Sequence, residues 1–176
     1  MTKPHTLSTE REIFRNQFLR LYAVRAEFEA GAKEYFVTDK GARVGVLAVR
    51  DHSVLLVRQY RFLINDHSWE IPGGGVGPAE TPEEAATREC WEEARVVCHA
   101  LEPVFDYRLG LDTTDSRVSL YRATSFTECP EPPAGGETDA REWVPLDECL
   151  ERVRSRRISD LMTIVALLYA THPRVG

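Results

Sequence analysis

The 176-residue chain lacks long apolar runs, paired cysteines and an excess of positive charge. Its most apolar stretch, residues 161–170, has about half of the roughly 20 residues that a membrane-spanning helix needs, so no membrane partner is expected. The first residues carry no apolar signal-peptide run, and none of the four cysteines forms a C-x-x-C pair. We therefore expect a cytoplasmic protein with reduced thiols. Nucleic-acid binders are generally basic, so a net charge of −6 argues against a nucleic-acid partner.

The composition is that of a folded domain, because 43% hydrophobic and 28% charged residues fit neither a disordered nor a fibrous chain. The length suits one domain over residues 1–176. Within it we expect an N-terminal strand region at about 12–40 and a catalytic core at about 41–176.

Alternating and Val/Leu-rich segments predict a mostly antiparallel β structure with few helices, which indicates an α+β fold. Residues 73–78 hold four glycines and a proline and are predicted to form a loop. The expected strands are 18–29, 34–38, 42–49, 53–60, 102–109, 117–123 and 141–144, with a hairpin turn at 50–52. The expected helices are 82–94, a short one from 145, and 159–170.

The start of the helix at 82–94 carries the clearest local signal. Thr81 and Glu84 form a capping-box pattern, in which each side chain accepts a hydrogen bond from the other residue's backbone N–H. Pro82 occupies the first helical position, where its missing N–H is not needed.

Six glutamates are concentrated in and just before this helix. Three of them, Glu89, Glu92 and Glu93, fall within about a third of the helix circumference at roughly 100° per residue. Neighbouring carboxylates raise one another's pKa, and hard cations such as Mg²⁺ or Mn²⁺ relieve that repulsion. An acidic face exposed to water is the alternative. The preceding glycines favour a ligand site, because backbone without side chains can approach a pyrophosphate closely. Residues 80–93 alone carry a net charge of −5, so the rest of the chain is nearly neutral.

This segment resembles the Nudix box, G-x5-E-x7-R-E-U-x-E-E-x-G-U with U aliphatic. Every charged position of the box is matched. Two positions depart from it, since Cys90 replaces an aliphatic residue and Arg95 replaces the final glycine. If the backbone is left-handed at Arg95, the substitution costs about 1 kcal/mol. The matching residues are Gly74, Glu80, Arg88, Glu89, Glu92, Glu93 and Val96.

The resemblance implies the Nudix fold, an α/β/α sandwich around a mixed sheet, and hydrolysis of a nucleoside diphosphate linked to another group. It implies Mg²⁺, or Mn²⁺, held by Glu89, Glu92, Glu93 and the carbonyl of Gly73. Arg88 is implied to orient these carboxylates, a role compatible with a structural salt bridge.

Outside the box, the chain resembles the ADP-ribose pyrophosphatase branch of the family. The similar segments are 56–61, 69–72, 143–148 and 158–168, and the resemblance covers most of residues 15–170. It implies that Arg61 binds a substrate phosphate beside Gly74 and Gly75. It also implies a homodimer in which N-terminal strands complete the partner's site. Residues 108–116 lack the branch's proline and place Ser116 where a glutamate often stands, so the expected substrate is a nucleoside diphosphate sugar, ADP-ribose or a related compound.

The expected reaction needs a general base, and Glu137 is the first candidate, with Glu131 and Glu93 as rivals. Three alternatives stay open at this point. The chain could be a non-catalytic Nudix-like module that binds nucleotide sugars, or a Nudix hydrolase of another nucleotide substrate. An isomerase of allylic diphosphates shares the fold, but Cys90 and Cys98 are not obviously placed for that chemistry.

Overall fold

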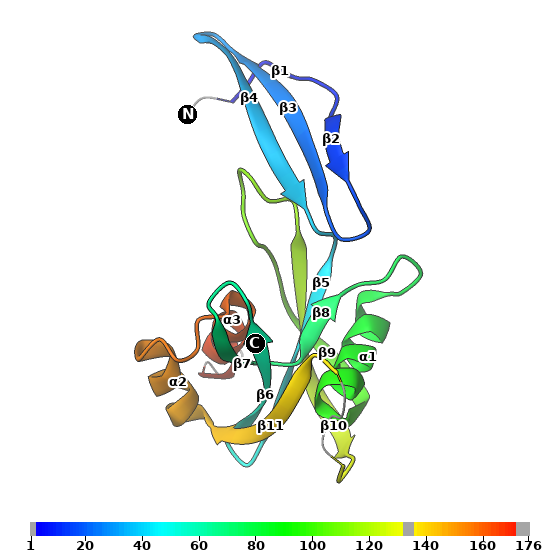
Figure 1. Cartoon of the computed structure of the whole chain (residues 1–176), viewed down its shortest axis with the longest axis vertical. Helices are drawn as coiled ribbons and strands as arrows, with labels where there is room; N and C mark the ends of the chain where they lie inside the picture. The colour runs from blue at the N-terminus through cyan, green and yellow to red at the C-terminus, as the bar shows by residue number, and fades with distance from the viewer. Residues whose placement is uncertain (1–2, 132–135, 172–176) are drawn as a thin grey trace. The chain divides into compact units, whose positions relative to one another are not determined.

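The computed structural model describes residues 3–131 and 136–171 (Figure 1). The chain folds into two compact units. The first unit contains Met1–Ala42 and Tyr107–Val118, and the second contains Arg43–Asp106 and Ser119–Gly176. The first unit therefore takes in a segment from the middle of the chain besides the N-terminal strands.

The first unit is built on a four-stranded sheet with β3 at its centre. β3 pairs antiparallel with β1 and β2 on one edge and with β4 on the other. Thr38 of β4 holds the inserted segment, because its carbonyl accepts a hydrogen bond from Asp115 N and its N–H donates one to Thr113 O. The strands are β1 (Thr6–Leu7), β2 (Arg11–Arg15), β3 (Arg20–Phe28) and β4 (Gly31–Asp39). The two strands expected at 18–29 and 34–38 are confirmed as β3 and β4.

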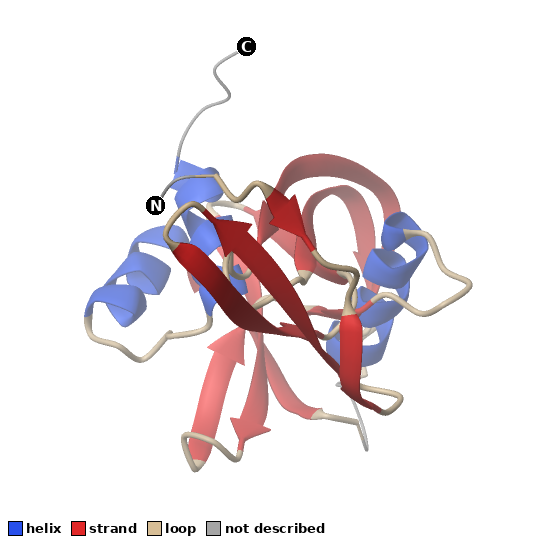
Figure 2. Ribbon diagram, turned by 90° about the horizontal axis from the view of Figure 1, so that it is seen from above, coloured by secondary structure: helices blue, strands red, loops and turns tan. Residues whose placement is uncertain are grey.

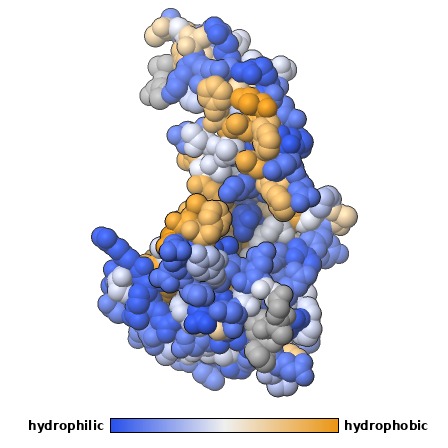
Figure 3. All heavy atoms as spheres, viewed as in Figure 1, coloured by the Kyte–Doolittle hydropathy of each residue, from blue (hydrophilic) through white to orange (hydrophobic). Residues whose placement is uncertain are grey.

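One face of this sheet carries two exposed phenylalanines beside the ion pair of Arg11 and Glu34. Phe14 pairs with Leu21 across β2 and β3, and Phe36 pairs with Ala23 across β4 and β3. Leu21 and Ala23 are two residues apart, so these four side chains share one face. Phe14 is 50% exposed and Phe36 is 52% exposed. Figure 3 shows apolar side chains gathered at the surface of this sheet.

The second unit is a layered structure with helices on both sides of a sheet. Helix α1 packs against β5 and β8, α3 contacts β5 from the other side, and α2 contacts β6 and β11 (Figures 1 and 2). The helices are α1 (Pro82–Ala94), α2 (Leu146–Arg154) and α3 (Leu161–Thr171). This arrangement confirms the α+β sandwich. Of the helices in the described part of the chain, none has the length and apolar character to cross a membrane.

The sheet of this unit has the strand order β11-β6-β5-β10-β9, with β7 paired to β6 and β8 paired to β5. Its strands are β5 (Arg43–Arg50), β6 (Ser53–Arg61), β7 (Asp66–Glu70), β8 (Gly73–Gly75), β9 (Val96–Arg108), β10 (Arg117–Glu128) and β11 (Thr138–Pro145). The ends of β9 and β10 that are joined by residues 109–116 belong to the first unit. The apolar core lies between the sheet and α1, where Leu55 and Val57 of β6 join Cys90 and Ala94 of the helix.

The glycine-rich segment differs from the prediction. Instead of being irregular throughout, Gly73–Gly75 forms β8 and pairs antiparallel with β5, with Gly73 opposite Gly45. A Cβ atom at Gly73 would collide with the carbonyl oxygen of Val44 and the side chain of Met162. Glycine propensity alone argues against a strand, but here the missing side chains permit the close approach that the pairing requires.

Candidate functional site

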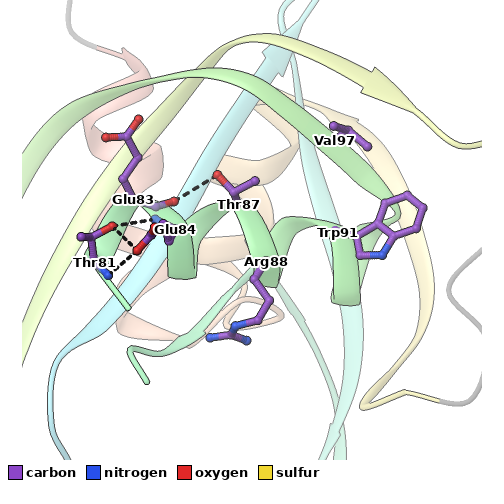
Figure 4. Close-up of a pocket in the computed structure, with 7 residues that line it drawn as sticks. All are labelled: Thr81, Glu83, Glu84, Thr87, Arg88, Trp91 and Val97. Atoms are coloured by element: carbon purple, nitrogen blue, oxygen red, sulfur yellow. Dashed lines mark hydrogen bonds between the residues drawn. The ribbon is translucent and has the colours of Figure 1, made fainter. Parts of the chain in front are cut away.

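Helix α1 begins where the capping box predicts. Thr81 Oγ1 accepts from Glu84 N at 3.3 Å, and the Glu84 carboxylate accepts from Thr81 N at 2.8 Å. Figure 4 shows the two side chains facing each other at the helix start. Pro82 is the first helical residue. These contacts satisfy backbone donors that would otherwise lack partners, so the first turn is fixed.

Helix α1 ends at Ala94, and the capping residue Arg95 has a left-handed backbone with φ 54° and ψ 41°. Its N–H donates to Trp91 O at 3.0 Å, which closes the last turn. The Arg95 guanidinium lies 5.1 Å from the centre of the Trp91 ring. The left-handed geometry that the box glycine normally provides is therefore kept with an arginine, at the expected strain.

Arg88 connects three glutamates with the glycine strand. Its guanidinium lies 2.7 Å from Glu80, 2.9 Å from Glu89 and 3.0 Å from Glu92, and it donates to Gly75 O at 3.0 Å. The hydrogen bonds raise the pKa of Arg88, and they lower the pKa of Glu80 to about 2. Arg88 thus stays charged and sets the direction of two predicted metal ligands, which fits the orienting role expected of it.

Glu93 is the most buried of the predicted ligands, at 9% exposed. Its Oε2 accepts from Gly73 N at 2.8 Å. Burial, opposed by this hydrogen bond and assisted by Glu89 and Glu137, raises the pKa of Glu93 to about 7. Burial also raises the pKa of Glu89, although Arg88 opposes it. Two carboxylates with raised pKa values at one place form a site that a cation would stabilise.

Gly74 leaves space for the Glu89 carboxylate. A Cβ atom at Gly74 would collide with the Glu89 oxygens, whereas a Cβ at Gly75 would meet no atom within 4 Å. The absence of a side chain at Gly74 thus lets β8 lie directly against a carboxylate of α1.

The donor set around β8 and α1 consists of carboxylate and backbone oxygens, which suits Mg²⁺ or Mn²⁺. Among the described residues, no group of three or more acidic, histidine or cysteine side chains is already gathered into a metal cage. Glu89 and Glu92 are turned to Arg88, and Glu93 is turned to Gly73. These oxygen ligands suit a hard divalent cation, and the three glutamate side chains lie near one another because all come from α1.

Glu137 and Glu93 share one hydrogen-bond donor, the buried side chain of Gln59, which the sequence did not single out. Gln59 Nε2 is 3.1 Å from Glu137 Oε2 and 3.4 Å from Glu93 Oε1. The rival acid Glu131 is exposed, and no hydrogen bond or ion pair between described residues joins it to Glu93. Of the two loop acids, Glu137 is therefore the one that contacts Gln59, the residue that also contacts Glu93.

The chain on either side of residues 130–137 is attached to the end of α1. Cys129 N donates to Arg95 O at 2.9 Å, and Thr138 Oγ1 donates to Glu93 O at 2.7 Å. Arg141 of β11 donates to Ala94 O and, at 2.5 Å, to Cys129 O. These contacts satisfy the carbonyls at the helix C-terminus, and they fix where Glu137 enters the site.

Arg61, the predicted phosphate ligand, is paired with an acid of the neighbouring strand. Its Nε and Nη2 atoms lie 2.8 and 2.5 Å from the two oxygens of Glu70. Glu70 is buried, whereas the Arg61 side chain is 43% exposed. The hydrogen bond with Glu70 is the main cause that raises the pKa of Arg61, and the charge of Glu93 adds a smaller part.

Sequence reasoning missed Gln59, Thr138 and Arg141 because each acts through a contact between distant segments. Gln59 offered one usable signal, since it stands two residues after Val57 and so continues the buried face of an apolar strand. A polar side chain on such a face needs a buried partner. No comparable local pattern marks Thr138 or Arg141.

Known proteins resemble this chain over most of its length. Residues 39–162 match the model of the NUDIX domain. The chain is 30% identical over 166 residues to an ADP-ribose pyrophosphatase of Bacillus subtilis, covering 90% of this chain and 88% of that protein. It is 29% identical over 161 residues to a CMP-5'-(N-acetyl-N-hydroxy-3-aminopropyl)phosphonate hydrolase of Streptomyces rubellomurinus, covering 90% and 78%. A crystal structure of an ADP compounds hydrolase superposes with a TM-score of 0.78 at 19% identity, covering 96% of this chain and 92% of that one.

Proposed function

Because the chain belongs to the Nudix family and is a pyrophosphohydrolase, we propose that it cleaves a nucleoside diphosphate sugar, ADP-ribose or a related compound. The products are a nucleoside monophosphate and a sugar phosphate. The observation that carries this proposal is the meeting of Glu137 and the buried Glu93 at Gln59, beside the glutamates of α1. It supplies a second acid next to the predicted metal ligands, as a hydrolytic site needs.

We propose Mg²⁺, with Mn²⁺ as a substitute, as the cofactor. The side chains of Glu89, Glu92 and Glu93 and the carbonyl of Gly73 would hold it. When bound, the metal supplies charge neutralisation at the pyrophosphate and a more acidic water. The all-oxygen donor set and the raised pKa values of Glu89 and Glu93 support this assignment.

The chain's own residues would divide the remaining work. Glu137 is the proposed general base, which takes the proton of the attacking water. Arg88 orients the carboxylates of Glu89 and Glu92 through its two ion pairs. Arg61 is proposed to contact a substrate phosphate, for which it must leave part of its pairing with Glu70. Gly74 and Gly75 let the pyrophosphate approach the backbone of β8.

A second candidate is a Nudix hydrolase acting on another nucleotide. The relative from Streptomyces rubellomurinus is named for a CMP-linked phosphonate. The altered segment 108–116 supports keeping this candidate. Both candidates share one chemistry, attack at a phosphorus of a nucleotide anhydride.

The substrate screen that tests the function measures phosphate-containing products from ADP-ribose, other nucleotide sugars, CMP conjugates, dinucleotides and nucleoside triphosphates. Each reaction is run with Mg²⁺ and with a chelator. The proposal expects the fastest metal-dependent release from a nucleotide sugar. Faster release from a CMP conjugate would favour the second candidate, and release from no compound would refute both.

The role of Glu137 is tested by the variant Glu137→Gln, which keeps the shape and removes the base. Loss of a general base lowers kcat by about 10²-fold or more. A kcat within about threefold of the parent at saturating Mg²⁺ would remove Glu137 from the role and leave Glu131 and Glu93 as the candidates.

We also propose that the protein is a homodimer that acts on small molecules in the cytoplasm and has no nucleic-acid partner. The exposed Phe14 and Phe36 on one face of the N-terminal sheet support association with a second copy.

A further inference from the structure

Gln59 occupies an unusual place for a polar side chain. It lies in β6, between Ser68 of β7 and Thr138 of β11 in the strand register. It continues the strand face of Leu55 and Val57, which pack in the apolar core against α1. Gln59 is 4% exposed, so its amide has left water almost completely. Burial of an amide is unfavourable unless it finds hydrogen-bond partners.

The partners of this amide are two carboxylates from different parts of the chain. Gln59 Nε2 lies 3.1 Å from Glu137 Oε2 and 3.4 Å from Glu93 Oε1. An amide nitrogen carries two hydrogens, so it can donate to both acids at once. Two carboxylates that lie within 3.4 Å of one amide nitrogen repel each other when both are charged. A donor between them offsets that repulsion and fixes their separation.

The two contacts are not equivalent. Glu93 also accepts from Gly73 N at 2.8 Å, so it keeps a fixed direction without Gln59. For Glu137, the contact with Gln59 is the hydrogen bond that ties its carboxylate to the buried end of the site. Removal of the amide should therefore displace Glu137 more than Glu93.

We propose that Gln59 is a positioning residue for the hydrolytic reaction, which holds the Glu137 carboxylate against Glu93. The inference rests on the proposed function of Glu137 as the base. In this role Gln59 acts through the direction of one carboxylate, because its amide donates to Glu137 and not to a reacting group. An error of about 1 Å in the position of a catalytic group costs about 10²-fold in rate.

The variant Gln59→Met tests this role, because methionine has a similar length and no N–H donor. We expect kcat to fall by about 10- to 100-fold with KM within about threefold. Ser68→Ala, a change at the buried polar position opposite Gln59, is the matched control and should keep kcat within about threefold. Should Gln59→Met fold poorly, Gln59→Leu makes the same test, because leucine already occupies position 55 on the same face of β6.

A double-mutant cycle separates positioning from general damage. In the Glu137→Gln background the carboxylate is gone, so adding Gln59→Met should lower kcat by less than about threefold further. A full additional loss in that background would show that Gln59 acts independently of Glu137 and would overturn the inference. An unchanged kcat for Gln59→Met alone would overturn it too.

Hydrogen exchange gives a readout that needs neither substrate nor metal. We expect the backbone amides of residues 136–138 to exchange faster in Gln59→Met than in the parent, with the amides of α1 unchanged. Equal exchange at 136–138 would overturn the inference. A parent that cleaves no substrate would refute the proposed function, and the exchange data would then decide on the Gln59 contact alone.

Discussion

The Glu93 carboxylate makes the stability of the protein depend on pH in a defined direction. Its pKa is 4.5 in a free side chain and about 7 in the folded protein, mainly because it is buried. The folded state therefore binds the proton more tightly than the unfolded state. The contribution of Glu93 to stability is complete below pH 4.5 and is lost as the pH rises to about 7.

The variant Glu93→Gln measures this contribution, because the amide has a similar shape and does not titrate. In a chelating buffer, the free energy of unfolding of the parent should fall relative to the variant by about 3 kcal/mol between pH 4.5 and pH 8. Denaturant unfolding at several pH values gives both curves. If the gap between the curves stays constant within about 0.5 kcal/mol, Glu93 is not the titrating group.

Alanine variants at Gly74 and Gly75 can test whether Glu89 needs the space that β8 leaves beside it. A methyl group at Gly74 would push the Glu89 carboxylate away, whereas one at Gly75 points into open space. We expect Gly74→Ala to weaken Mn²⁺ binding by about tenfold or more, and Gly75→Ala to change it by less than about threefold. Calorimetric titration with Mn²⁺ in the absence of substrate checks both values. Equal affinities in the two variants would contradict the proposed role of Glu89.

At the scale of elements, the strain at the end of α1 belongs to a single residue. Arg95 has φ 54°, which glycine adopts without a Cβ clash. The variants Arg95→Gly and Arg95→Ala both lose the contact with Trp91. They differ in that clash and in the larger backbone entropy of glycine in the unfolded chain, which acts in the opposite direction. Arg95→Gly should exceed Arg95→Ala in free energy of unfolding by about 1 kcal/mol, as denaturant unfolding can measure. A more stable alanine variant would show that the backbone relaxes out of the left-handed region.

Local signals predicted some elements well, and tertiary pairing decided the others. Helix α1 follows from Thr81, Pro82 and Glu84, because its start depends on hydrogen bonds between near neighbours. The strand at Gly73–Gly75 could not be predicted, since its pairing with β5 overrides the low strand propensity of glycine. The same limit applies within the site. The sequence predicts that Glu89, Glu92 and Glu93 lie together, because all three are on one helix. It does not predict the contact of Glu137 with Gln59, which joins residues 78 positions apart.

At the scale of the whole molecule, the exposed Phe14 and Phe36 on one face of the N-terminal sheet predict association. We expect light scattering to give twice the chain mass of 20.0 kDa. Phe36→Asp puts a charge on that face and should return the mass to one chain. Val97→Asp is the control, because Val97 is also an exposed apolar residue, at 40%, but lies in β9 of the second unit. A parent that stays at one chain mass at all concentrations would refute the dimer.

The two attachments to the end of α1, at Cys129 and Thr138, make the intervening segment exchangeable in protein engineering. Both attachments end on carbonyls of Glu93 and Arg95, so they hold the helix independently of the sequence between them. Doubling the length of a flexible loop costs only about 0.6 kcal/mol. A longer segment inserted between Cys129 and Glu137 should therefore leave the end of α1 in place. Glu89, Glu92 and Glu93 would then keep their places on the helix.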